Sequence, residues 1–238
     1  MSYHLDPHPA EKSKIYVLLA GGLALLIWAF GMASWASGQK LSSPATPAII
    51  TPPPGNRLFL VGHAVGTQGY ICLPGASGTS WMVSGSRPEA TLFIGAPGHV
   101  RQIVTHFLSL NSNPNEFAPD PLPFGSPTWQ SSADSSKVWG QTLNSIASGS
   151  DASCPHDGAI ACLLLQSIGS ATGPDGGALM SQTTFIQRLN TQGGSIPTQG
   201  CSVAGDVGKQ ALVPYSADYF FFRKNKAVHT KTTRYEFF

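Results

Sequence analysis

Residues 57–73, RLFLVGHAVGTQGYICL, hold two short apolar runs, Arg57–Val61 and Gly69–Leu73, separated by glycine and polar residues. Runs of about five residues bounded by turn-forming residues are typical of β-strands, whereas an amphipathic helix needs a longer stretch with a period of 3.6 residues. This pattern recurs along most of the chain and decides its fold class. The other runs are Trp81–Val83, Thr91–Ile94, Gln102–Leu108, Val138–Leu143, Ala161–Ile168, Thr183–Leu189 and Tyr215–Phe222.

Glycine and proline punctuate these runs, with 26 and 19 occurrences in 238 residues. Many short strands between such residues indicate a sandwich or a barrel. We therefore expect a mainly β, soluble domain over residues 56–222. Two stretches are ambiguous. Ala161–Ile168 is continuously apolar and suits either a central strand or a buried helical turn, and Ser136–Ile146 has a weak helical pattern.

An uncharged stretch, IYVLLAGGLALLIWAFGMASWASGQ, lies between Lys14 and Lys40. About 20 apolar residues are enough to cross a bilayer, so a single transmembrane helix is predicted over residues 15–37. A cleaved secretory signal is the alternative, because two lysines precede the run and Ser34-Trp35-Ala36 is a small-x-small site. The length of the run and the bulky Trp28, Phe30 and Trp35 favour the anchor.

The positive charges that flank this stretch predict its orientation. Lys12 and Lys14 precede it, whereas Lys40 and then Arg57 follow, which favours a cytoplasmic segment 1–14 and an exported domain. The prediction is a single-pass protein of the bacterial inner membrane, with its N-terminus inside and its domain in the periplasm. Small residues four positions apart let another helix approach closely. The predicted helix contacts with other membrane subunits are Ala20, Ala24 and Trp28.

Segments of different composition flank the predicted domain. Residues 38–55 are rich in proline, which favours an extended, semi-rigid spacer between membrane and domain. Residues 223–238 hold five of the fourteen Lys and Arg residues and one of the twelve acids. Such a basic, aromatic segment either docks on anionic lipid or an acidic protein surface, or is a solvated terminus. Its candidate contact residues are Arg223, Lys224, Lys226, Tyr235 and Phe238.

The four cysteines, Cys72, Cys154, Cys162 and Cys201, form no CxxC motif, which disfavours redox and zinc-ribbon sites. An exported domain lies in an oxidising compartment, where disulfides are the expected state. The short loop CPHDGAIAC favours Cys154 with Cys162 and leaves Cys72 for Cys201. Three connectivities are open for four cysteines.

Polar and aromatic side chains in the strand-like runs are the candidate ligand-binding residues on a concave β surface. A metal site of His63, His99, His106 or His156 with Asp134 would need a spacing such as HxH or HExxH, and neither occurs. No metal or other cofactor is therefore predicted. The full set of candidate binding residues is His63, Gln68, Tyr70, His106, Trp129, Asp134 and Trp139.

Motifs of the common enzyme classes are missing from the sequence. The nearest match to the G-x-S-x-G elbow is the turn Gly75-Ala76-Ser77-Gly78, and there is neither a P-loop nor a dinucleotide fingerprint. No catalytic residue is predicted, and the protein is expected not to be an enzyme. Nucleic-acid binding is not expected either, because the domain lacks a basic surface.

Several segments follow one another in a distinctive order: Leu60–Gln68 with Tyr70 and Cys72, Thr105–Phe107, Thr128–Gln130, Asp134, Val138–Gly140, Leu163–Gln166, Thr184–Thr191, Gly200–Cys201 and Val213–Phe221. Their order resembles the DUF3455 family over residues 56–222. The resemblance implies an exported domain of unassigned function; the malate dehydrogenase label of some fungal members has no support in these residues. Cys72 and Cys201 fall in family-like segments, whereas Cys154 and Cys162 do not.

Three functional hypotheses follow from these observations. The first is a non-catalytic accessory subunit of a larger membrane complex, respiratory or photosynthetic, which contacts other subunits and the bilayer through its helix, outer face and basic tail. The second is an exported module that binds a small ligand. The third, a metal-dependent or hydrolytic enzyme, has the weakest basis because the catalytic motifs are missing.

Overall fold

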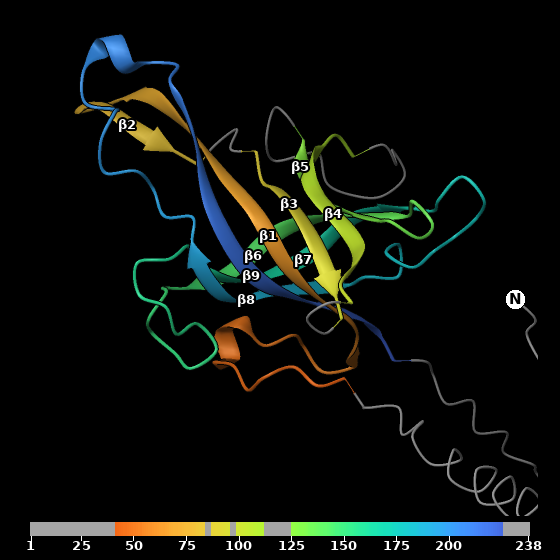
Figure 1. Cartoon of the computed structure of the whole chain (residues 1–238). Helices are drawn as coiled ribbons and strands as arrows, with labels where there is room; N and C mark the ends of the chain where they lie inside the picture. Colours follow the sequence, from red (N-terminus) through yellow and green to blue (C-terminus); the bar gives the residue numbers. More distant parts are fainter. Residues whose placement is uncertain (1–40, 84–86, 96–98, 112–124, 226–238) are drawn as a thin grey trace, which may run out of the picture. The chain divides into compact units, whose positions relative to one another are not determined.

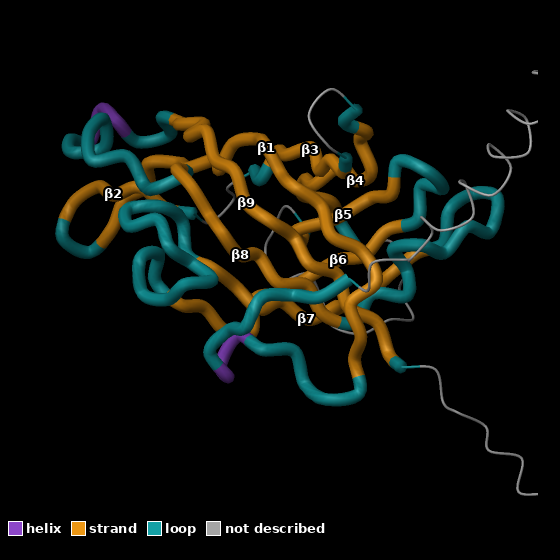
Figure 2. Tube along the Cα trace, turned by 60° about the horizontal axis from the view of Figure 1, so that its bottom comes forward, coloured by secondary structure: helices purple, strands orange, loops and turns teal. Residues whose placement is uncertain are grey.

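Nine antiparallel strands form one sheet that closes on itself (Figures 1 and 2). The computed structural model describes residues 41–83, 87–95, 99–111 and 125–225. The sheet closes because β1 pairs with β3 on one side and with β9 on the other, so β1 and β3 to β9 make an eight-stranded barrel. The strands are β1 (Asn56–Gly75), β2 (Gly78–Met82), β3 (Glu89–Ile94), β4 (Arg101–Ser109), β5 (Ser126–Ser131), β6 (Lys137–Ile146), β7 (Cys162–Ala171), β8 (Phe185–Gly193) and β9 (Gln210–Lys224).

The long strand β1 organises the barrel and joins the two apolar runs of residues 57–73 into one element. It pairs with β9 from Asn56 to Ile71, and its last five residues form a hairpin with β2 that extends past the barrel (Figure 1). Gly66 faces β3 so closely that a Cβ atom there would overlap the carbonyl oxygen of Glu89. A glycine is therefore required where β1 bends onto β3.

Alternation of side chains explains why some strands read as unbroken apolar runs. In β9, Tyr219 and Phe221 belong to the barrel core, whereas Phe220 and Phe222 belong to a second buried cluster on the outside of the sheet. The same holds for β7, where Leu165 is inside and Leu164 outside. A strand that is buried on both faces loses the apolar–polar alternation of a half-exposed strand. Ala161–Ile168 is thus a strand rather than a helical turn.

The helix that the weak pattern of Ser136–Ile146 indicated does not form. Residues 137–146 are the strand β6. Long-range packing decides the outcome: Val138 enters the barrel core, and Gly140 lets the Trp129 ring approach, where a Cβ atom would lie 2.8 Å from the ring. The strand β5 was not predicted, because its sequence SPTWQS has a single large apolar side chain between polar ones and therefore no apolar run.

The second buried cluster, on the outside of the sheet, is called here the outer cluster. It includes Ile50 from a short 3₁₀ turn, Ala48–Ile50, in the predicted proline-rich connector. Ile50 is fully buried, and the Gln187 side-chain amide donates a 2.7 Å hydrogen bond to the Ile50 carbonyl. Residues 46–51 therefore belong to the folded domain, which shortens the spacer predicted over residues 38–55. The outer cluster consists of Ile50, Cys154, Cys162, Leu164, Leu189, Phe220 and Phe222.

One end of the barrel is closed by the segment between β7 and β8, which Asp134 holds in place. Its carboxylate accepts hydrogen bonds from the Leu179 N–H (2.9 Å) and from the Ser136 hydroxyl (2.7 Å). Partial burial raises the pKa of Asp134, but these hydrogen bonds outweigh it and lower the pKa to about 2. These hydrogen bonds hold the closing segment so that its fully buried Met180 packs in the barrel core.

Replacing Asp134 by alanine should lower the free energy of unfolding by about 2 kcal/mol, because the donors of the buried Ser136 and the half-buried Leu179 lose their acceptor. Asp175→Ala is the matched control, since it removes an exposed carboxylate from the same closing segment. Urea unfolding of both variants checks this. An equal, small effect of the two substitutions would show that Asp134 does not hold the segment.

The predicted anchor and most of the predicted tail lie outside the described residues, including Ala20, Ala24, Trp28, Lys226, Tyr235 and Phe238. Within the described ranges, no helix has the length and apolar character that a membrane span needs. Arg223 and Lys224, assigned from sequence to the tail, are the last residues of β9. The Arg223 guanidinium lies 5.0 Å above the Phe59 ring, so it packs on the domain.

Candidate functional site

A cavity of about 500 Å³ lies inside the barrel. Seven of the eight barrel strands contribute to its wall, all except β3. Leu108 near the end of β4, Pro127 near the start of β5 and Leu163 near the start of β7 place it toward the end where the β1–β2 hairpin extends. The opposite end is filled by core side chains such as Met180, Ile186 and Phe221.

The wall of the cavity is mostly apolar, with a few polar groups. A volume of this size is typical of sites for small organic molecules, which combine apolar walls with a small number of polar contacts. The aliphatic wall residues are Val83, Pro88, Leu108, Pro127, Leu163 and Leu165; the aromatic and polar ones are His106, Trp129, Tyr219, Gln68, Thr142 and Arg188.

Three stacked and edge-on rings form the aromatic part of the wall. His106 of β4 and Trp129 of β5 are direct cross-strand partners, and their rings stack with centroids 4.2 Å apart. The Tyr219 ring meets both edge-on, at 5.5 Å from His106 and 5.8 Å from Trp129. The Trp129 indole N–H is buried and has no hydrogen-bond acceptor within the part of the chain that is described. The rings therefore form a rigid wall with an unused donor.

His106 is neutral at physiological pH. Burial lowers its pKa to about 3; the hydrogen bond to the Thr128 carbonyl opposes this shift and the Arg188 charge adds to it. Because that carbonyl can only accept, His106 Nδ1, at 2.9 Å, carries the hydrogen of this bond. The neutral ring then has its acceptor lone pair on Nε2.

Among the wall residues that the structure describes, Arg188 of β8 is the single charged one. Its Nε and Nη2 atoms both donate to the Ala161 carbonyl, at 3.2 and 2.8 Å. No carboxylate in the described ranges lies within 4.0 Å of its guanidinium. Three of its five N–H groups therefore have no protein acceptor among the described residues.

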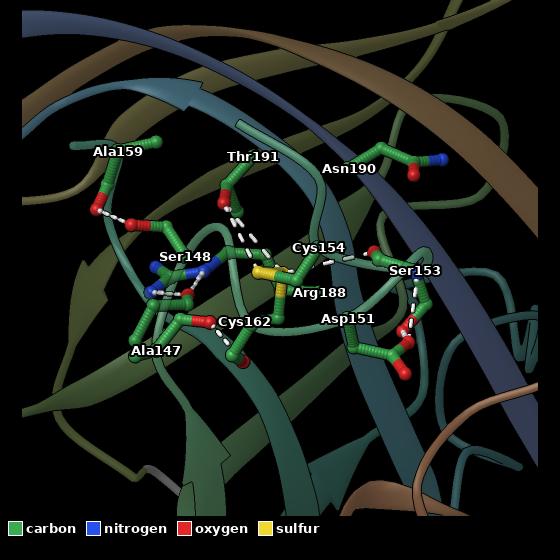
Figure 3. Close-up of a disulfide and its surroundings, with 12 residues drawn as sticks. Ala147, Ser148, Asp151, Ser153, Cys154, Ala159, Cys162, Arg188, Asn190 and Thr191 are labelled. Carbon is green, nitrogen blue, oxygen red and sulfur yellow. Dashed lines mark hydrogen bonds between the residues drawn. A yellow bond between two sulfur atoms is a disulfide. The ribbon is translucent and has the colours of Figure 1, made fainter. Parts of the chain in front are cut away.

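A disulfide loop holds the carbonyl that Arg188 contacts. Ala161 directly precedes Cys162, which is bonded to Cys154. Figure 3 shows Arg188 beside this disulfide, with the Thr191 hydroxyl 3.7 and 3.6 Å from the two sulfur atoms. Thr191 also donates to the Ile160 carbonyl (2.6 Å), and the Asn190 N–H donates to the Ser153 carbonyl (2.9 Å), so the loop is fastened to β8 just after Arg188.

Both disulfides favoured by the sequence are confirmed, Cys154–Cys162 and Cys72–Cys201. Of the candidate binding residues, Gln68, His106 and Trp129 come together in the cavity wall. Tyr70 is buried nearby, where its hydroxyl donates to the Gly194 carbonyl at 2.5 Å, but it does not line the cavity.

The other candidates lie elsewhere. His63 is on the outer face of β1, 2.5 Å from Asp218 with its side chain 66 % exposed, and Asp134 closes the far end of the barrel. Trp139 lies on the face of β6 opposite to Val138, with its indole N–H bonded to Ser109. No three His, Cys, Asp or Glu side chains gather as metal ligands anywhere in the described ranges.

Sequence reasoning missed Arg188 and Tyr219 as wall residues. Arg188 is the one charged residue in the apolar run Thr183–Leu189, at the same alternation as the core residue Ile186. A lone arginine at an inward position of a strand is a signal that was present in the sequence.

These features define a class: a closed antiparallel barrel with an internal, mostly apolar cavity that contains one arginine. The sequence model of a family described as "Protein of unknown function (DUF3455)" matches residues 53–223. The chain therefore belongs to the DUF3455 family. Neither the search of curated proteins nor the search of solved structures found a match.

Proposed function

We propose that this domain binds a small, largely apolar molecule inside its barrel. The cavity is the observation that supports this function. An eight-stranded barrel is just wide enough for side chains to fill, and protein interiors contain few voids larger than a water molecule. Here about 500 Å³ is left open while the far end of the same barrel is packed.

Calorimetric titration of the full chain with two water-soluble probes, 4-phenylbutyrate and 4-phenyl-1-butanol, tests this proposal. The chain is held in lipid nanodiscs, and the heat of empty nanodiscs is subtracted. We expect saturable binding of one probe molecule per chain. The tryptophan of Leu163→Trp should occupy the cavity and abolish binding, because Leu163 lines the wall.

Val65→Trp is the matched control, since it adds the same ring to an outward position of β1 whose side chain is 62 % exposed. It should leave binding unchanged. If neither probe binds saturably to the unchanged protein, or if Leu163→Trp binds as well as Val65→Trp, the barrel is not a binding site for such molecules.

A role in a membrane complex is a separate proposal, supported by the uncharged run from Ile15 to Gln39. A retained anchor would place the domain outside the cytoplasmic membrane, where disulfides such as the two found here persist. Chemical crosslinking in native membranes should then capture specific neighbouring subunits. A lone monomer after mild detergent extraction would count against an accessory subunit.

A further inference from the structure

The charge of Arg188 inside the cavity leads beyond the binding of an apolar molecule. We propose that the ligand is an amphipathic monocarboxylate whose acidic group binds the guanidinium of Arg188. This inference rests on the proposed function and names the chemical class of the ligand.

The charges around the cavity favour an anionic ligand. Arg188 is half-buried, and a cation that loses part of its hydration is stabilised by an anion beside it. Among the described residues, Arg188 hydrogen-bonds only a neutral carbonyl, and none of those that line the cavity is acidic. Its aromatic neighbours supply no negative charge either: burial raises the pKa of Tyr215, and His106 is neutral. The described wall of the cavity thus carries one positive charge, which one carboxylate balances.

The free N–H groups of Arg188 have the geometry that a carboxylate requires. A guanidinium can bind both oxygens of a carboxylate through two parallel N–H groups. The Ala161 carbonyl uses the N–H of Nε and one N–H of Nη2. The edge formed by Nη1 and the second N–H of Nη2 is left for such a pair. Because Ala161 and the disulfide loop hold the other edge, the free one is already oriented.

The rest of the cavity wall suits an apolar body on the ligand. Beyond Arg188 the cavity offers aliphatic side chains and the His106–Trp129 stack, which suit a hydrocarbon or aromatic body. Gln68 and the Nε2 atom of His106 add two polar groups in the wall, enough for a hydroxyl or carbonyl on that body. A ligand with several charges would leave the additional charges in this apolar surrounding unpaired.

The two probes of the calorimetric titration separate this inference from binding itself, because they share a body and differ in the acidic group. We expect the full chain in nanodiscs to bind 4-phenylbutyrate about tenfold or more tightly than 4-phenyl-1-butanol, as for a hydrogen bond to a charged group. Arg188→Met should lose this preference while still binding the alcohol. Arg188→Lys, which keeps the charge without the fork, should keep part of it.

Arg57→Met is the control, because it removes an exposed arginine at the start of β1. Equal affinities of the unchanged protein for the two probes would overturn the carboxylate inference and leave the binding function standing. Loss of both probes from Arg188→Met, in a variant with an unaltered melting temperature, would also overturn it. No binding of either probe to the unchanged protein would overturn the binding function instead.

Discussion

Replacing Cys72 and Cys201 together by serine is expected to lower the free energy of unfolding by about 5 kcal/mol. This bond joins residues 129 positions apart, and a crosslink reduces the entropy of the unfolded chain more when the loop it closes is longer. It ties the β8–β9 connection to β1, where the Cys72 N–H also donates to the Lys209 carbonyl at 2.9 Å. Urea unfolding under non-reducing conditions measures the loss.

The second disulfide provides an internal control. Cys154 and Cys162 are only 8 positions apart, so their joint replacement by serine should cost about 2.5 kcal/mol. Cys72, Cys154 and Cys162 are fully buried and Cys201 is half-buried, so the difference between the two replacements mainly reflects loop length. Equal losses would mean that native-state packing or residual structure in the unfolded chain, rather than loop closure, determines the stabilisation.

The fold class could be predicted because it depends on local patterns, while the closure of the sheet could not. Apolar runs at Gln102–Leu108 and Tyr215–Phe222 coincide with β4 and β9 because strand formation depends on side-chain type and turn residues. Closure depends on the pairing of β1 with β9, which are separated by most of the domain. Ser136–Ile146 shows the same limit, since Trp129 on another strand decides its conformation.

The candidate site was predictable to the extent that its residues are unusual within their own strand. Gln68, His106 and Trp129 are polar or aromatic residues within strands, although only His106 lies in one of the apolar runs, and all three reach the cavity. His63 and Trp139 fit the same description but point outward, because a shift of one residue along a strand changes the face. The register of the barrel, rather than residue type, separates these two groups.

Acidification from pH 6.5 to pH 4 is expected to lower the free energy of unfolding by about 3 kcal/mol through His106. In the unfolded chain this histidine takes up a proton near pH 6.5, whereas in the folded protein burial delays protonation until about pH 3. The unfolded state therefore binds one more proton within this window, and stability falls by up to about 1.4 kcal/mol per pH unit as pH decreases. The contribution of the neutral His106 to the free energy of unfolding is fully present above pH 6.5.

His106→Gln should flatten this dependence, because glutamine does not titrate, although the loss of the stack with Trp129 lowers stability at every pH. His99→Gln, at an exposed position, should keep the slope of the unchanged protein. Carboxylates contribute mainly below about pH 4, so urea unfolding between pH 4 and 7 separates the histidine from them. Parallel curves for the unchanged protein and His106→Gln would mean that the folded protein admits a proton to this ring. The wall beside Arg188 would then carry a second positive charge at mildly acidic pH, and its preference for a single carboxylate would not hold there.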